Sequence, residues 1–177
     1  MFLKKIKNKL KVRAARKYLR QELGSPSDTQ NGGVGIGSIG CIVDLDKFND
    51  TDSFYEFVEE FSLRPNSVKV IGYKEFYDKN SPYSTPVFSD KDLGWEANIE
   101  NSYALEFLGR EYDLLVNYYS EDKLLLQLMS IKTKARLKVG FGEVDKNFND
   151  LILNTPIDDF KTFKMELKKY LRVLNEI

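Results

Sequence analysis

The chain has no histidine, a single cysteine and no long apolar run, and each shortage excludes a class of function. Without histidine there is no Ser–His–Asp or Cys–His nucleophilic site, no histidine general base and no histidine metal ligand. One cysteine cannot form an intrachain disulfide, which indicates a reducing compartment. No segment approaches the ~18 apolar residues of a membrane-spanning helix, and the N-terminus lacks the apolar core of a secretory signal.

The composition is that of a globular domain, with 177 residues of which 42% are hydrophobic and 31% are charged. A chain of this length can bury one core without disulfide or metal cross-links. We therefore expect a cytoplasmic protein, and we leave open peripheral attachment to the inner face of the membrane.

Basic residues are concentrated at the N-terminus, although the formal net charge of the chain is zero. Residues 1–20 contain no acidic residue, whereas the rest has eighteen basic and twenty-seven acidic residues, a net charge of −9. The nine basic residues of this segment are Lys4, Lys5, Lys7, Lys9, Lys11, Arg13, Arg16, Lys17 and Arg20. An acidic body with a basic arm is a poor surface for duplex nucleic acid, because phosphates need cations over a broad face.

Apolar residues recur in the basic segment at helical spacing. Phe2, Leu3, Ile6 and Leu10 form one stripe, and Val12, Ala15 and Leu19 continue on a shifted stripe. The pattern predicts a basic amphipathic helix over residues 1–20. Such a helix could pack on the acidic body, lie on an anionic membrane surface, or bind a protein partner, and nucleic acid is the least favoured partner.

Residues 21–36 are rich in glycine and polar residues and predict a flexible linker, and residues 37–177 predict one domain. Within that domain apolar runs alternate with helical stripes. The predicted strands cover residues 39–45, 68–73, 113–119, 135–141 and 151–154, with a short strand near 86–88, and the predicted helices cover residues 54–61, 99–110, 120–132 and 157–173. Alternation of this kind predicts an α/β fold: a three-layer α/β/α Rossmann-like domain with a mostly parallel sheet of five or six strands.

The segment Gly35–Gly40 matches the dinucleotide-binding pattern GxGxxG, but its context is different. The pattern binds pyrophosphate when it follows a strand and opens a helix. Here it follows the linker and leads into a strand, so we interpret the glycines as a flexible entry to that strand.

Acidic and aromatic residues outside the arm have competing interpretations. Asp44 and Asp46 resemble the DxD motif of haloacid-dehalogenase-like phosphatases, although the next residues, Lys47 and Phe48, do not follow that motif. Asp158-Asp159 is interpreted as a helix cap. Cys41 is expected to be a core thiol, and the aromatic segment 76–98 either fills an edge of the core or forms a binding loop.

In open parallel sheets, ligands bind beyond the carboxyl ends of the strands, where the strand order reverses. The predicted crevice at this point is acidic and aromatic, which suits a hydroxyl-rich or cationic ligand better than a phosphate. Its candidate residues are Asp44, Asp46, Asn49, Asp50, Asn117, Tyr119, Ser120, Gly140 and Phe141, with Gly142 beside them. We assign no catalytic residue, no cofactor and no metal ligand.

The order of these segments, from residues 39–44 through Phe88–Trp95 and Tyr112–Asn117 to Lys138–Gly140, resembles a family of uncharacterised Bacteroidota proteins that begin with a basic helix. The run from Tyr112 to Phe141 also resembles the N-terminal half of heptosyltransferase-type GT-B glycosyltransferases. That resemblance implies a bacterial Rossmann-like domain in which Asp50 serves an acceptor. Those enzymes hold the sugar donor in a second Rossmann domain, for which 177 residues leave no room.

These features favour a non-catalytic binding or adaptor domain whose arm docks on a membrane surface or a partner. The alternative is a protein that binds a small sugar or nucleotide, or a degenerate glycosyltransferase-like enzyme, using the carboxylate crevice.

Overall fold

Six strands form one sheet in the order β3-β2-β1-β4-β5-β6. The computed structural model describes residues 2–25, 35–78, 80 and 82–177 of the chain. The strands are β1 (Ile39–Asp44), β2 (Val68–Tyr73), β3 (Val87–Phe88), β4 (Glu111–Tyr118), β5 (Lys134–Phe141) and β6 (Leu151–Leu153). Every neighbouring pair is parallel. All six residues of β1 are buried, as expected for a central strand that is covered on both faces. The predicted parallel sheet is therefore confirmed.

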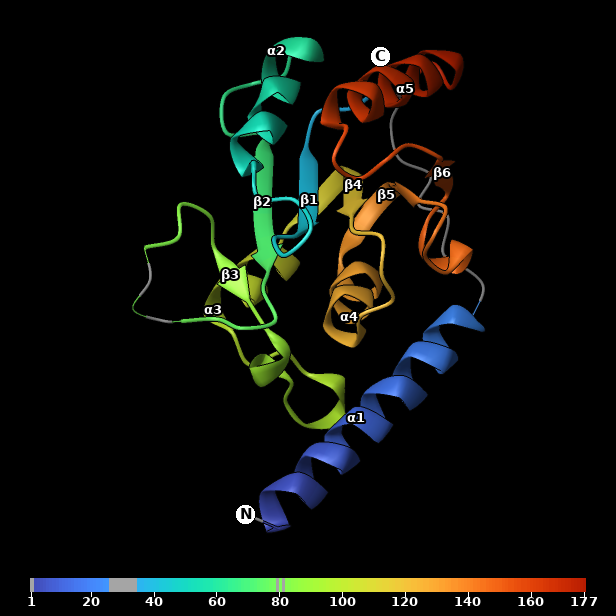
Figure 1. Ribbon diagram of the computed structural model, residues 1–177. Helices are drawn as coiled ribbons and strands as arrows, with labels where there is room; N and C mark the ends of the chain where they lie inside the picture. Colours follow the sequence, from blue (N-terminus) through green and yellow to red (C-terminus); the bar gives the residue numbers. More distant parts are fainter. Residues whose placement is uncertain (1, 26–34, 79, 81) are drawn as a thin grey trace.

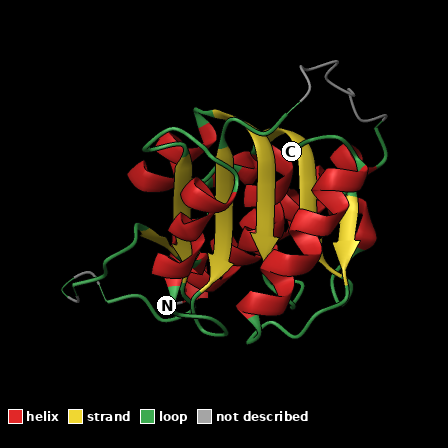
Figure 2. Cartoon of the chain, turned by 90° about the horizontal axis from the view of Figure 1, so that it is seen from above, coloured by secondary structure: helices red, strands yellow, loops and turns green. Residues whose placement is uncertain are grey.

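Helices cover both faces of the sheet and make three layers (Figures 1 and 2). The α-helices are α1 (Phe2–Leu23), α2 (Phe57–Glu60), α3 (Ser102–Leu108), α4 (Leu124–Lys132) and α5 (Phe160–Val173), and the 3-10 turns are η1 (Thr51–Glu56), η2 (Asp90–Asp92), η3 (Trp95–Ala97) and η4 (Lys146–Phe148). One face carries α2 and α5, the other carries α3 and α4, and α1 packs outside α4. This arrangement and strand order are Rossmann-like.

Each face of the sheet has its own apolar core. Below α2 and α5 the core is aromatic: the rings of Phe54, Tyr118 and Phe160 lie within 4.9–5.9 Å of one another, centroid to centroid. The Tyr118 hydroxyl donates a 2.7 Å hydrogen bond to the Ile157 carbonyl, so the buried phenol is satisfied. The core on the other face joins α1, α3 and α4 to the sheet.

Several helices differ from the sequence prediction at their ends. The segment predicted as one helix over 54–61 is divided between the end of the 3-10 turn η1 and the single α-helical turn α2. The helix predicted from Ser120 begins at Leu124, and the helix predicted over 99–110 is confined to Ser102–Leu108. There the Asn101 side chain accepts the Ala104 N–H at 3.0 Å, and this cap determines where the helix starts.

The N-terminal helix runs to Leu23, beyond the boundary predicted at residue 20. Part of the predicted linker is therefore helical. Residues 26–34 of that linker lie outside the described residues.

Candidate functional site

The C-terminal half of α1 is docked on the body. Ala15 and Leu19 are 0% and 5% exposed, and they join the apolar core that lies below α4. The ammonium group of Lys132 on α4 lies 4.2 Å from the centre of the Tyr18 ring, and burial lowers the pKa of that lysine. The shifted stripe predicted from the sequence is thus the side of the helix that packs against the body.

The turn beneath α1 is strained. Glu96 and Ala97 both have positive φ angles, of 53° and 62°, which are unfavourable for residues with a side chain. Ala97 is nevertheless fully buried in the same core as α1. Lys11 donates a 3.0 Å hydrogen bond to the Leu93 carbonyl and lies over the Trp95 ring at 5.8 Å, so α1 contacts this turn at several points.

The N-terminal half of α1 extends past the body (Figure 1). Three of its apolar residues, which we call the outer apolar stripe, are Leu3, Ile6 and Leu10 with exposed fractions of 72%, 39% and 49%. At roughly 100° per residue, the stripe lies about 170° around the helix from Ala15 and Leu19. The stripe therefore faces away from the docked side and cannot be covered by the body in this arrangement.

Cations surround the outer apolar stripe. Five of them lie within about a quarter turn of it, and we call these the cationic flank: Lys7, Lys9, Arg13, Lys17 and Arg20. Arg13 and Arg20 also line a hollow of about 350 Å³ along the helix. Among the described residues, no cation of α1 forms a salt bridge, although the body is strongly acidic. Apart from the Lys11 ammonium, which contacts Leu93 and Trp95, the charge of α1 is thus not used to hold the helix on the described part of its own body.

At the sheet's carboxyl edge, ion pairs bridge the point where the strand order reverses between β1 and β4. The carboxylate of Asp44 is fully buried and receives a 2.8 Å hydrogen bond from the Lys123 ammonium, which also lies 5.0 Å from the centre of the Tyr73 ring. A second pair, Lys47 with Glu121 at 2.6 Å, crosses at the surface and lowers the pKa of the glutamate. Asp44 is predicted at this edge, but its partner Lys123 and the residue Glu121 could not be recognised from the sequence, because nothing in the spacing pairs a charge at the end of β1 with one after β4.

Two other predicted crevice residues belong to a buried polar network. The Asn117 amide oxygen accepts a hydrogen bond from the Ser130 hydroxyl at 2.8 Å, and the Tyr119 hydroxyl lies 2.7 Å from the same oxygen of Ser130. The side-chain amides of Asn117 and Asn149 are joined by a 2.8 Å hydrogen bond. Burial raises the pKa of Tyr119, so its phenol remains protonated in the folded protein. The network ties β4 to α4.

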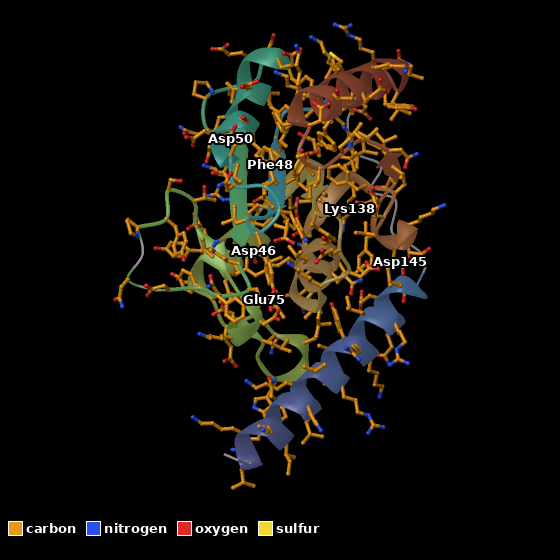
Figure 3. The ribbon with its side chains drawn as sticks, viewed as in Figure 1. Asp46, Phe48, Asp50, Glu75, Lys138 and Asp145 are labelled. Carbon is orange, nitrogen blue, oxygen red and sulfur yellow. The ribbon has the colours of Figure 1, made fainter. Side chains whose placement is uncertain are left out.

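The remaining predicted residues are spread along this edge. Asp46 is exposed and accepts the Glu75 N–H at 2.9 Å, and the two residues lie side by side in Figure 3. Asp50 lies apart from them, nearer α2, and accepts a 2.5 Å hydrogen bond from the Ser53 hydroxyl. Phe141 is in the core, Ser120 is half-buried, Asn49 is exposed, and a side chain at Gly140 would collide with Asn149. The structure thus joins Asp44 to Asp46, whose N–H donates to it, but does not bring Asp50 to them.

The glycine segment leads into β1, as its context predicts. Its amides are occupied: the Asp113 carboxylate accepts the N–H groups of Gly37 and Ser38, each at 2.9 Å. Beside it, Arg136 binds Glu176 through two 2.6 Å hydrogen bonds, and these lower the pKa of the glutamate. An open hollow of about 640 Å³ lies here, at the amino ends of the strands.

Cys41 is buried in β1, and burial raises the pKa of its thiol, so it is the core residue that the sequence predicts. The predicted cap is also confirmed, because Asp159 accepts the Thr162 N–H at 3.0 Å. The aromatic segment is divided: Phe88 is fully buried, whereas Phe76 is 80% exposed.

Within the ranges that the structure describes, no three metal-ligating side chains are grouped closely enough to hold an ion. No described helix is both long and apolar enough to cross a bilayer.

The chain belongs to a family of unknown function (DUF6913), whose model matches residues 11–174. No curated protein and no solved structure is significantly similar to it. The match begins inside α1, so it includes the docked half of that helix but not the outer apolar stripe.

Proposed function

We propose that this protein is a non-catalytic binding or adaptor protein that docks on an anionic membrane surface through the outer side of α1. The observation that carries the proposal is the outer apolar stripe, which is exposed, faces away from the body and is surrounded by unpaired cations in the described part of the chain. An amphipathic helix of this kind lies in the interface plane, with its apolar residues at the acyl boundary and its cations among the headgroups.

The favourable energies have the order of magnitude of weak, reversible binding. Each cation near an anionic leaflet contributes about 1 kcal/mol, and full burial of one leucine or isoleucine side chain contributes about 1.5–3 kcal/mol. The five flanking cations and three partly exposed apolar side chains together are comparable to the entropic cost of association, so binding is expected to be weak and to depend on both groups.

A second copy of the chain is a less suitable occupant of the same surface. The spacing of Leu3, Ile6 and Leu10 is that of a coiled-coil seam. The next two seam positions, however, are Arg13 and Lys17. Two such helices would bring like charges together, and a negatively charged surface meets the same cations favourably.

The test is co-sedimentation of the full chain with phosphatidylcholine vesicles, with and without phosphatidylglycerol. We expect binding only to the vesicles with phosphatidylglycerol, and weaker binding as salt is raised. Replacing the three residues of the outer apolar stripe with glutamine should abolish binding. A matched control replaces three equally exposed apolar residues of other helices with glutamine, Leu105, Met165 and Val173, and should bind normally.

Two outcomes would contradict the proposal. One is that the intact protein stays in the supernatant at low salt. The other is that sedimentation velocity shows a dimer that the glutamine substitutions dissociate, with no vesicle binding.

A further inference from the structure

A hollow of about 380 Å³ lies over the connection between β2 and β3, and its lining differs from the rest of the surface. Three tyrosines (Tyr77, Tyr83 and Tyr103), two prolines (Pro82 and Pro86) and Ser84 contribute to it. None of the described residues that line it is charged, although 31% of the chain is. A lining of phenol rings and hydroxyl groups without charge suits a neutral ligand that has both apolar faces and hydroxyl groups.

Neighbouring groups fix the orientation of the tyrosine rings that line the hollow. Tyr77 and Tyr83 pack on each other with their centroids 5.3 Å apart, and the Tyr83 hydroxyl accepts the Asp78 N–H at 3.3 Å. Thr85, at the floor, is buried and its hydroxyl lies 2.6 Å from that of Thr51 in η1. Packing and hydrogen bonds therefore orient the ring surface before any ligand arrives, which lowers the entropic cost of binding.

The hollow adjoins the carboxyl edge of the sheet. A second hollow of about 110 Å³ shares Tyr83, Ser84 and Thr85 with it and adds Asn49 and Lys74, which follow β1 and β2. The Asn49 amide and the Lys74 ammonium can hydrogen-bond to hydroxyl oxygens. Together the two hollows have the size of ordinary small-molecule sites and lie near the edge where α/β sheets bind ligands.

We propose that this hollow binds a saccharide, with a sugar ring packed on the tyrosines and its hydroxyl groups directed to Ser84 and toward Asn49. A phosphorylated ligand fits less well, because no cation lines the larger hollow among the described residues and the Lys74 ammonium of the adjoining hollow is paired with the Asp46 carboxylate at 3.5 Å. The site shares no residue with α1, so it is independent of the proposed membrane docking.

Saturation-transfer difference NMR on the full chain tests this, with glucose, galactose, N-acetylglucosamine, maltose and cellobiose as the probes. We expect transfer to at least one of them. Tyr83→Ala and Tyr103→Ala should each weaken its affinity by about 3- to 10-fold, the loss expected for one ring contact. Tyr103 is 53% exposed, so its substitution leaves the fold intact even if Tyr83→Ala does not. The control is Tyr170→Ala, which removes a partly exposed tyrosine of α5 and should change nothing.

The proposal is overturned if none of these saccharides receives transfer, or if the affinity is unchanged in both variants. It is also overturned if a polyproline peptide, which prefers aromatic grooves, binds in a Tyr83-dependent manner and the saccharides do not. Loss of vesicle binding through the α1 substitutions leaves the saccharide result unaffected, so failure of either proposal can be recognised separately.

Discussion

Replacing Lys123 with methionine should destabilise the fold far more than replacing Asp44 with asparagine, although both changes break the same ion pair. Asp44 is fully buried, whereas the Lys123 side chain is 18% exposed. Lys123→Met leaves a buried carboxylate whose described hydrogen-bond partner is the Asp46 N–H, and we expect a cost of about 3–5 kcal/mol. Asp44→Asn keeps an oxygen for that N–H and leaves an ammonium that can turn to water or to Glu121, so it should cost about 1–2 kcal/mol.

Urea denaturation, monitored by circular dichroism, measures the loss of unfolding free energy in both variants. An unchanged dependence of this free energy on urea concentration shows that only stability has changed. The double variant should be more stable than Lys123→Met alone, because no charge is then buried without a partner. The matched control is Lys47→Met, which breaks the exposed pair with Glu121 and should hardly move the urea midpoint. The reasoning is refuted if Asp44→Asn costs as much as Lys123→Met, or if Lys123→Met behaves like the control.

Three further predictions concern α1, acid sensitivity and strain. Leu19→Ala should cost about 2–3 kcal/mol because Leu19 is buried, while Leu10→Ala should change stability by less than about 0.5 kcal/mol; equal losses in urea denaturation would mean that α1 packs differently. The hydrogen bonds from Arg136 lower the pKa of Glu176 from its ordinary value of 4.5, so their stabilisation is present above that pH and is lost as the pH falls through the lowered pKa. Glu176→Gln should therefore reduce the acid-induced loss of stability in thermal melts from pH 6 downward, and an unchanged profile would contradict this. Glu96→Gly should stabilise the fold by about 0.5–1 kcal/mol, since glycine accepts its positive φ angle at no steric cost; a lower melting temperature would show that the turn is not strained.

The positions of the strands followed from the sequence because each is a short segment rich in apolar residues, bounded by turn or helix signals. The predicted β2 matches residue for residue, and β1 differs by one residue at its end. Helix ends were less predictable. Ser120 looks like a cap, but Lys123 is directed to Asp44, and the helix begins only after this lysine. That contact joins residues 79 positions apart, and local spacing carries no information about it.

The candidate binding surfaces also differ in how much of them the sequence predicts. The apolar and cationic residues of α1 could be identified from periodicity, because a helix places residues three and four apart on one side. The buried side of α1 could not be identified from periodicity, because it depends on where the turn at Glu96 and Ala97 meets the helix. The hollow lined by Tyr77, Tyr83 and Tyr103 had no counterpart in the sequence beyond an aromatic segment, since Tyr103 reaches it from α3 and the other two tyrosines lie in the connection between β2 and β3.

By itself, the amino-acid sequence determined the α/β class, the parallel sheet, the basic helix and the absence of histidine chemistry, because these depend on composition and on patterns a few residues long. Only the tertiary structure decided that Asp44 is paired with Lys123, that Asp113 occupies the amides of Gly37 and Ser38, and that the outer apolar stripe is left uncovered. Each of these outcomes depends on groups that are distant in sequence and meet only when the layers pack.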